Sequence, residues 1–186
     1  MPTQTKNGFT LIELIFTLAI ASILLSLSMP SFADLVDRNK ISAEVSQLRG
    51  SLQLGRKAAI TQSKKVTLCP TINGEQCSQD WSDGYMVFID DNEDRQLDPN
   101  EELLLQSKIG DANIKLRWCA FGVRSSFQWH QTGITNHQNG TFQYCYTNKP
   151  ELSRGLFISK AGRIRMSKDE NGDGIHENAS GNNIDC

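Results

Sequence analysis

The chain has 186 residues, of which 38% are hydrophobic, with 19 lysines and arginines against 21 aspartates and glutamates. This length suits one globular domain with an appendage and argues against a multidomain enzyme. A formal charge of −2 argues against a wholly basic nucleic-acid binder, and 14 glycines with 5 prolines exclude collagen-like and low-complexity proteins. Charge and hydrophobicity are unevenly distributed along the chain, and this distribution carries the functional information.

Residues 9–29 form an apolar segment whose only formal charge is Glu13. As a helix rising about 1.5 Å per residue, the segment would span about 30 Å, the thickness of a bilayer core. No small-residue cleavage site follows it, so we expect it to remain in the mature protein. A carboxylate inside such a helix costs roughly 2.5–3.5 kcal/mol on insertion scales. Glu13 therefore needs a partner, unless it lies near the membrane surface, where it can snorkel or be protonated.

The residues around Glu13 form a motif that suggests a partner for its carboxylate. Gly8-Phe9-Thr10-Leu11-Ile12-Glu13 resembles the class III leader of type IV pilins and pseudopilins. The resemblance implies cleavage after Gly8 by a prepilin peptidase, methylation of Phe9, and pairing of Glu13 with the N-terminal amine of a neighbouring pilin subunit. Residues 1–8 would be the leader peptide. Residues 9–30 would be a single-pass inner-membrane anchor, and in the assembled filament the helical core.

The pattern becomes amphipathic after Pro30, which falls where pilins commonly place a helix-kinking proline. Apolar residues recur at steps compatible with a 3.6-residue period, namely Leu35, Ile41, Val45, Leu48, Leu52 and Ala59. We expect one long helix from about Phe9 to Ile60, bent or locally melted at Pro30. Its amphipathic half, residues 31–65, should lie against a sheet.

Residues 66–186 form a region of short candidate strands separated by polar turns. The candidates are 66–69, 84–89, 102–106, 113–121, 126–130, 141–146, 155–160 and 162–167, with the last two joined in a hairpin at Ala161-Gly162. One helix followed by antiparallel strands is an α+β arrangement. The order of VTLCP, WSDGYMVFIDDNEDRQLDPNEELL and LFISKAGRIRMS resembles the FimT, FimU and GspH branch of minor pilins and pseudopilins. This resemblance implies the type IV pilin-like fold, with the long N-terminal helix, transmembrane in its first half, packed on antiparallel β-sheets.

Five cysteines occur, at positions 69, 77, 119, 145 and 186. An oxidising periplasm favours pairing, and the odd number leaves at least one cysteine unpaired within the monomer. Cys69 and Cys77 flank a turn-rich loop and are the favoured first pair. Cys145 with Cys186 would pin a polar tail, and Cys119 with Cys145 is the competing pair.

Two acidic stretches invite a comparison with calcium loops. Oxygen-bearing residues occupy positions 1, 3, 5, 7, 9 and 12 of an EF-hand-like loop at Asp90, Asn92, Asp94, Gln96, Asp98 and Glu101. Arg95 stands where this loop requires glycine, so we favour a solvated acidic turn. Asp169-x-Asn171-x-Asp173-Gly174 begins similarly but has Ser180 at position 12, which makes it the weaker candidate. No Cys-x-x-Cys occurs, and His130, His137 and His176 are expected at the surface, so we expect neither a metal nor a cofactor.

The segment from residue 154 to 168 is basic and contains no acid. Its cations are Arg154, Lys160, Arg163, Arg165 and Lys168. Arg163 and Arg165 are two apart on a candidate strand and should share a face, and Gly162 would let a phosphate backbone approach. Guanidinium forks suit phosphates, and such binding would be independent of sequence and sensitive to salt. Gly162-Arg163-Ile164-Arg165 resembles the G-R-x-R motif of FimT-type minor pilins of naturally competent bacteria, which implies binding of double-stranded DNA.

Two functions follow. In the first, the chain is a minor pilin, reaching the cell surface in a type IV pilus, that binds extracellular DNA through the basic hairpin during natural transformation. In the second, it is a purely structural minor pilin or a type II secretion pseudopilin that primes assembly, and the arginines are a solvated face or subunit contacts. Trp118, Trp129 and Tyr144 could stack on bases, but their strand setting favours the core. No Ser/His/Asp order, nucleotide loop or metal constellation points to an enzyme.

Overall fold

The computed structural model describes residues 8–120, 125–135 and 138–186, without the side chains of residues 27–31. The chain divides into two compact units, Met1–Asn39 and Lys40–Cys186. Part of the candidate strand 113–121, at residue 121, and His137 lie outside the described residues.

One helix, α1, runs from Leu11 to Gln62. Thr10 begins it as an N-cap, because its Oγ1 accepts the backbone N–H of Glu13 at 3.3 Å. Ser63 ends it with a left-handed φ of 52°, the conformation that terminates many helices. The helix passes position 30 without interruption, so the expected local melting does not occur.

Within the first unit, the large apolar side chains of α1 that the structure describes are exposed. Leu35, expected on the buried face, belongs to this unit and is 53% exposed. Among the described residues, no helix combines the length and apolar character needed to cross a membrane.

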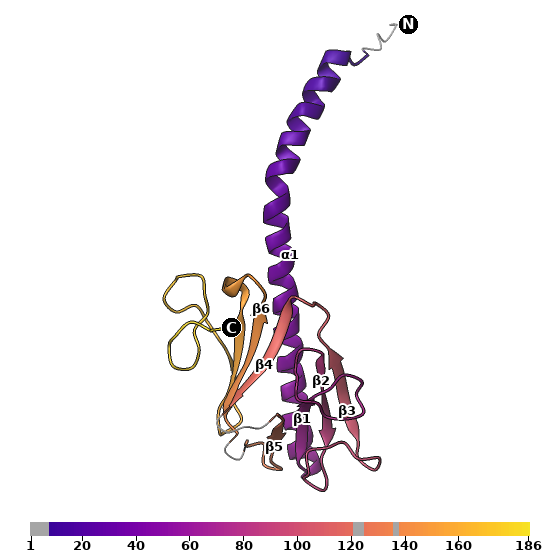
Figure 1. The fold of residues 1–186 in the computed structure, drawn as a ribbon, viewed down its shortest axis with the longest axis vertical. Coiled ribbons are helices and arrows are strands. Elements are labelled where there is room, and N and C mark those ends of the chain that lie inside the picture. The colour runs from indigo at the N-terminus through magenta and orange to yellow at the C-terminus, as the bar shows by residue number, and fades with distance from the viewer. Residues whose placement is uncertain (1–7, 121–124, 136–137) are drawn as a thin grey trace, which may run out of the picture. The chain divides into compact units, whose positions relative to one another are not determined.

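Among the described residues of the second unit, eight strands form two antiparallel sheets (Figure 1). The first sheet has the order β3-β2-β1-β5, with β1 Val66–Pro70, β2 Gly84–Ile89, β3 Leu103–Lys108 and β5 Phe127–Trp129. The second has the order β4-β6-β7-β8, with β4 Ile114–Ala120, β6 Gly140–Tyr146, β7 Arg154–Ile158 and β8 Ile164–Met166. A 3-10 turn, Pro150–Leu152, precedes β7.

The core lies where the second half of α1 packs on both sheets. The helix contributes Ile41, Val45, Leu48, Leu52 and Ala59, each at most 1% exposed. Strand residues complete the core from both sheets, including Val87 and Phe142. The α+β expectation of a long helix packed on antiparallel sheets is therefore confirmed.

Two disulfides join Cys69 to Cys77 and Cys145 to Cys186, and Cys119 is free and exposed. These are the two favoured pairs. The strand register explains why Cys119 does not pair with Cys145: Cys119 lies opposite Thr141, four residues along β6 from Cys145. At about 3.4 Å per residue this separation is roughly 13 Å, well beyond the reach of a disulfide.

The disulfide of the terminal Cys186 anchors the C-terminal tail, which winds in loops outside the sheets (yellow in Figure 1). The tail is also ordered by a buried side chain and by a bridge within the tail itself, neither of which the sequence analysis identified. Ile184 is only 3% exposed, and Glu177 forms an isolated antiparallel bridge with Asn183. Order in the tail therefore does not depend on the disulfide alone.

Candidate functional site

The basic hairpin consists of β7, β8 and the turn between them. Ser159 N–H donates to the Arg163 carbonyl at 3.0 Å, and Gly162 N–H donates to the Ser159 carbonyl at 2.8 Å. Gly162 has a φ of 77°, which favours glycine. The expected hairpin around Ala161-Gly162 is present, with β8 shorter than the expected strand.

The space beside Gly162 is filled by the protein itself. A Cβ at this position would lie 2.2 Å from the Gly133 carbonyl oxygen and 2.9 Å from a ring carbon of Trp129. The glycine thus allows the turn to pack closely against the loop that follows β5. The expectation that it opens the hairpin to a phosphate backbone is wrong, because those neighbouring atoms occupy the space.

Arg163 and Arg165 are exposed and line the same two surface hollows. One hollow, of about 470 Å³, also includes Lys160. A third, of about 610 Å³, brings Lys168 beside Arg165. The Arg165 guanidinium lies 5.8 Å from the centroid of the Phe157 ring, a cation–π contact that orients it. Four of the five predicted cations therefore gather around β8.

Arg154 is the exception. It lies at the opposite end of β7 from the turn and lines none of these three hollows. Its Nη1 donates to the carbonyls of Glu151 and Ser153, both at 2.8 Å. Arg154 therefore holds the connection before β7 rather than contributing to the basic cluster.

Cations of α1 that the sequence analysis did not single out lie beside the hairpin. Arg56 Nε donates to the Gly133 carbonyl at 3.0 Å, and its Nη2 donates to the Ala161 carbonyl at 3.2 Å. Lys57 is exposed and lines one hollow with Arg163 and Arg165. Helical periodicity places Arg56 and Lys57 on the polar face, but no local signal shows which strand that face meets.

The aromatic residues considered for base stacking belong to the interior. Trp129 and Tyr144 are 0% exposed. Trp118 is half-buried, with its ring centroid 4.3 Å from that of Phe142. The expectation that these rings are core residues is confirmed for Trp129 and Tyr144.

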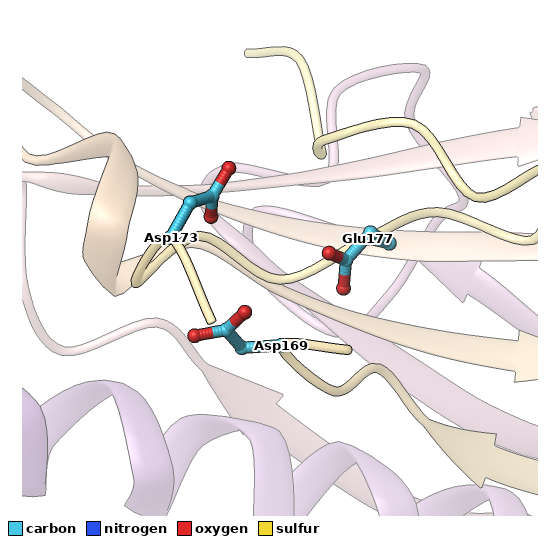
Figure 2. A group of neighbouring side chains, drawn as sticks. All are labelled: Asp169, Asp173 and Glu177. Atoms are coloured by element: carbon cyan, nitrogen blue, oxygen red, sulfur yellow. The ribbon is translucent and has the colours of Figure 1, made fainter. Parts of the chain in front are cut away.

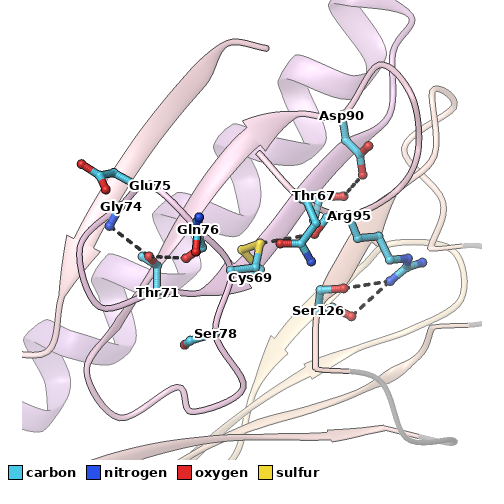
Figure 3. Close-up of a disulfide and its surroundings, with 12 residues drawn as sticks. Thr67, Cys69, Thr71, Gly74, Glu75, Gln76, Ser78, Asp90, Arg95 and Ser126 are labelled. Atoms are coloured by element: carbon cyan, nitrogen blue, oxygen red, sulfur yellow. Dashed lines mark hydrogen bonds between the residues drawn. A yellow bond between two sulfur atoms is a disulfide. The ribbon is translucent and has the colours of Figure 1, made fainter. Parts of the chain in front are cut away.

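The first acidic loop is closed by its own hydrogen bonds. Asp90 is 1% exposed, and its Oδ2 accepts from Thr67 Oγ1 at 2.5 Å (Figure 3). The same oxygen accepts from Gln128 Nε2 at 2.7 Å. Asn92 Nδ2 donates to Asp94 and Asp98 at 3.0 and 2.8 Å. The Glu101 carboxylate accepts backbone N–H groups of residues 91 and 98. Neighbouring protein donors thus occupy the oxygens named above, whereas the other Asp90 oxygen, Oδ1, is buried without a hydrogen-bond partner in the described part of the chain.

Arg95 turns as the glycine of a calcium loop would. Its φ of 70° is left-handed, so the turn forms although this conformation is unfavourable for an arginine. The guanidinium offsets the cost: Nη1 donates to the carbonyl and Oγ of Ser126 at 3.3 and 3.1 Å (Figure 3). The loop is tied in this way to the start of β5, close to the Cys69–Cys77 disulfide.

The second acidic loop, rated weaker from sequence, is the place where the described acids converge. Ligand oxygens of Asp169, Asp173 and Glu177 lie within 4.8 Å of one another (Figure 2). Glu177, only 6% exposed, occupies position 9, so a carboxylate enters the loop three residues before Ser180. The three carboxylates stand four residues apart, at positions 1, 5 and 9 of the loop, and this spacing could have indicated Glu177.

These three residues could hold a metal ion, yet the loop also satisfies them internally. Asp169 accepts the N–H groups of Gly172 and Gly174 at 2.7 and 2.9 Å. Glu177 accepts those of residues 170 and 171 at 2.8 and 3.3 Å. Hydrogen bonds led by that from Asn183 lower the pKa of Asp173.

His176 is half-buried, as is His130, so each of these expected surface histidines is only partly exposed. Its Nδ1 lies 2.9 Å from Ser167 Oγ, which also accepts the Gly155 N–H at 2.8 Å. Burial lowers the pKa of His176 below its ordinary value, and the positive charge of Arg154 acts in the same direction. His176 therefore connects the tail to the hairpin strands.

Both the sequence and the fold of this chain are similar to those of known proteins. Residues 4–29 match the prokaryotic N-terminal methylation motif, and residues 44–162 match the family described as type II transport protein GspH. The fold is similar to that of the type IV minor pilin FimU of Pseudomonas aeruginosa, with a TM-score of 0.54 and 20% identity over 70% of this chain and 90% of that one. The minor pseudopilin EpsH of the Vibrio cholerae type 2 secretion system gives a TM-score of 0.50 at 8% identity, covering 68% of this chain and 95% of that one.

Two curated relatives align with parts of the chain. Pilin-like protein PilA1 of Thermus thermophilus is 31% identical over 99 residues, and a fimbrial protein of Pseudomonas aeruginosa is 31% identical over 68 residues. The alignments cover 53% and 37% of this chain, and 58% and 44% of the length of those relatives.

Fold and N-terminal motif together define a protein of the type IV pilin superfamily, of the kind found among minor pilins and minor pseudopilins. Within that superfamily, the match over residues 44–162 shows that the chain belongs to the GspH family.

Proposed function

We propose that this chain is a minor pilin that binds double-stranded DNA through the basic hairpin during natural transformation. The supporting observation is that, in the described part of the chain, the hairpin arginines form no ion pair with an acidic residue. The described ion pairs use Lys40, Lys64 and Lys65, which meet Asp111, Asp91 and Glu93. Arg163 and Arg165 take part in none of these pairs, although both are exposed.

Exposed hairpin cations that take part in no described ion pair are suited to bind a polyanion. Planar guanidinium groups can donate two hydrogen bonds to one phosphate, and the Phe157 ring limits the freedom of Arg165. Lys160 extends the positive surface as a point charge, whereas the hollow that holds Lys168 also includes Glu170 and Glu177. Contacts of this kind bind the backbone without reading bases, and their affinity falls steeply with salt.

The N-terminal unit supports filament assembly. Under this proposal a prepilin peptidase removes residues 1–8, the new N-terminal Phe9 is methylated, and residues 9–30 anchor the subunit in the inner membrane before entering the filament core. The exposed Glu13 side chain then pairs with the N-terminal amine of a neighbouring pilin. Residues 31–65 continue the helix into the globular part, residues 66–186.

The test is DNA binding by the full-length chain in nonionic detergent, which covers the exposed apolar residues of the first unit. A labelled 30-base-pair duplex would be titrated at two salt concentrations with wild type and with Arg163→Gln/Arg165→Gln. We expect micromolar, salt-sensitive binding that falls about tenfold or more in the double variant, since each lost phosphate contact weakens binding. Absence of wild-type binding would contradict the proposal.

That outcome would favour the second candidate function, a structural pilin or type II secretion pseudopilin that primes filament assembly. The match to the GspH family and the fold shared with EpsH support this alternative. In that case the arginines would contact neighbouring subunits, and the double variant would reduce filament assembly instead of DNA binding.

A further inference from the structure

The largest of the hollows described above lies between α1 and the hairpin, and we call it the helix–hairpin trough. It has a volume of about 630 Å³. Lys57 and Ile60 line it from the helix, and Arg163, Ile164 and Arg165 line it from the hairpin. The helix and the hairpin therefore each contribute both cations and an isoleucine to the described lining.

The charge of the trough is unbalanced. No acid occurs among its described lining residues, and no described ion pair includes Lys57. Lys64 offers a direct comparison, because it is also an exposed lysine near the end of α1 but lies 2.8 Å from an Asp91 carboxylate oxygen. Lys57 thus keeps a full positive charge available for a ligand.

Arg56 determines the width of the trough. Its guanidinium joins the helix to the turn through the Ala161 carbonyl and to the loop after β5 through the Gly133 carbonyl. One side chain consequently links the helix to the hairpin turn and to the loop after β5. Arg56 acts as a positioning residue for the hairpin, and its remaining N–H groups add positive charge at the trough.

The cationic face continues along the helix to Arg49, whose Nη1 lies 3.7 Å from the sulfur of Met166 on β8. From Arg49 to Ile60 the helix rises about 16 Å. One DNA strand carries a phosphate for about every 3.4 Å of helix axis, so this length matches roughly five phosphates. The face is therefore long enough to follow a strand backbone.

We propose that α1 forms the second half of the DNA-binding surface, with Lys57 contacting phosphate and Arg56 holding the hairpin in register. This inference rests on the proposed function. The described lining of the trough contains no aromatic ring on which an unpaired base could stack. The surface therefore takes the backbone of double-stranded DNA and gives single strands no advantage.

The experiment compares full-length Lys57→Gln, Lys57→Arg and Lys64→Gln with wild type and with the Arg163→Gln/Arg165→Gln variant. Affinity for the 30-base-pair duplex is measured by fluorescence anisotropy at four salt concentrations, and thermal unfolding checks each fold. We expect Lys57→Gln to bind three- to tenfold more weakly at low salt. Its slope of log affinity against log salt should be shallower by about 0.9. Lys57→Arg and the Lys64→Gln control should resemble wild type.

The two proposals fail in different ways. Equal affinities and slopes for Lys57→Gln and Lys64→Gln, with binding lost in the double arginine variant, would overturn the role of the helix and leave the hairpin as the receptor. No binding by wild type would overturn both. Tighter binding of poly-glutamate than of DNA at matched charge would assign the trough to an acidic protein segment and also overturn the inference.

Arg56 is tested separately, because its role is to position the hairpin. Arg56→Lys keeps the charge but cannot reach both carbonyls in the same way. We expect it to weaken DNA binding severalfold with the salt slope unchanged, since no phosphate contact is lost. An unchanged affinity in Arg56→Lys together with a shallower slope in Arg56→Gln would show a direct contact and contradict the positioning role.

Discussion

Gly162 is the residue on which the hairpin depends most directly. Its positive φ and the 2.2 Å approach of the Gly133 carbonyl to its Cβ position are separate constraints. Gly172 shares only the first, with a φ of 80° and nothing within 4 Å of its Cβ position. Comparing a substitution at each glycine therefore separates the energetic cost of backbone strain from the cost of steric overlap.

We expect Gly162→Ala to lower the free energy of unfolding by roughly 2–4 kcal/mol, as backbone strain and overpacking add. Gly172→Ala should cost only about 1 kcal/mol, because its side chain enters open space. Urea unfolding of both variants measures the difference. Equal losses would show that the close contact at Gly162 is relieved without cost.

His176 gives the protein a pH-dependent element. The Nδ1 atom of its ring lies 2.9 Å from the Ser167 hydroxyl oxygen, which accepts the Gly155 N–H. Because burial depresses the pKa of His176 in the folded state, the unfolded chain takes up a proton first. The associated stability is present above about pH 6.5, the ordinary histidine value, and is lost as the pH falls through the folded pKa.

The predicted result is a fall in unfolding free energy below about pH 6.5 that becomes shallower in His176→Gln. Chemical unfolding at intervals between pH 7.5 and 4.5 measures it. His130→Gln serves as the control, since His130 contacts only its neighbour Thr132 among the described hydrogen bonds of its side chain. A steeper or unchanged fall in His176→Gln would contradict this assignment.

At the scale of the element, the two disulfides constrain very different lengths of chain. Cys69 and Cys77 are 8 residues apart and close one loop beside β1. Cys145 and Cys186 are 41 residues apart and enclose β7, β8 and the tail. The longer link therefore restricts the unfolded chain more and also joins the end of the C-terminal tail to β6.

Replacing the longer disulfide should cost more stability. Chain entropy predicts a loss of about 4 kcal/mol for Cys145→Ser/Cys186→Ser and about 2.5 kcal/mol for Cys69→Ser/Cys77→Ser. Double variants avoid leaving a thiol that could pair with the exposed Cys119. Urea unfolding under non-reducing conditions measures both. An equal or larger loss for the shorter disulfide would contradict the chain-entropy account.

At the scale of the whole molecule, the described core lies entirely within residues 40–186, while the N-terminal methylation motif lies within the first unit. The Glu13 backbone N–H, not its carboxylate, is the group bonded to Thr10. Stability of the globular unit and assembly of the filament should therefore respond independently to substitution of Glu13.

Glu13→Gln should leave the unfolding transition unchanged, because glutamine keeps the backbone cap and the core is elsewhere. Incorporation into filaments should fall about tenfold or more, since removing one partner of a buried charge pair costs about 2–5 kcal/mol. Immunoblotting of sheared filaments against the cell fraction measures it. Wild-type incorporation would show that the carboxylate has no role in assembly.

Local patterns were sufficient for much of this architecture. The alternation of apolar residues located the strands to within a few residues, and the 3.6-residue period identified the helix face from Ile41 to Ala59. The Thr10-x-x-Glu13 spacing is also typical of a helix N-terminus and agrees with the N-cap at Thr10. These features depend on interactions within a few residues, which is why sequence alone determined them.

Tertiary structure decided what surrounds the candidate site. The contact of Arg56 with Ala161 joins residues 105 apart, and strand register sets the distance between Cys119 and Cys145. Arg154 belongs to the same basic segment yet lies at the other end of β7. Side chains far apart in the chain meet only when sheet register and helix packing bring them together, so sequence determined which residues carry charge, and the fold decided which of them act together.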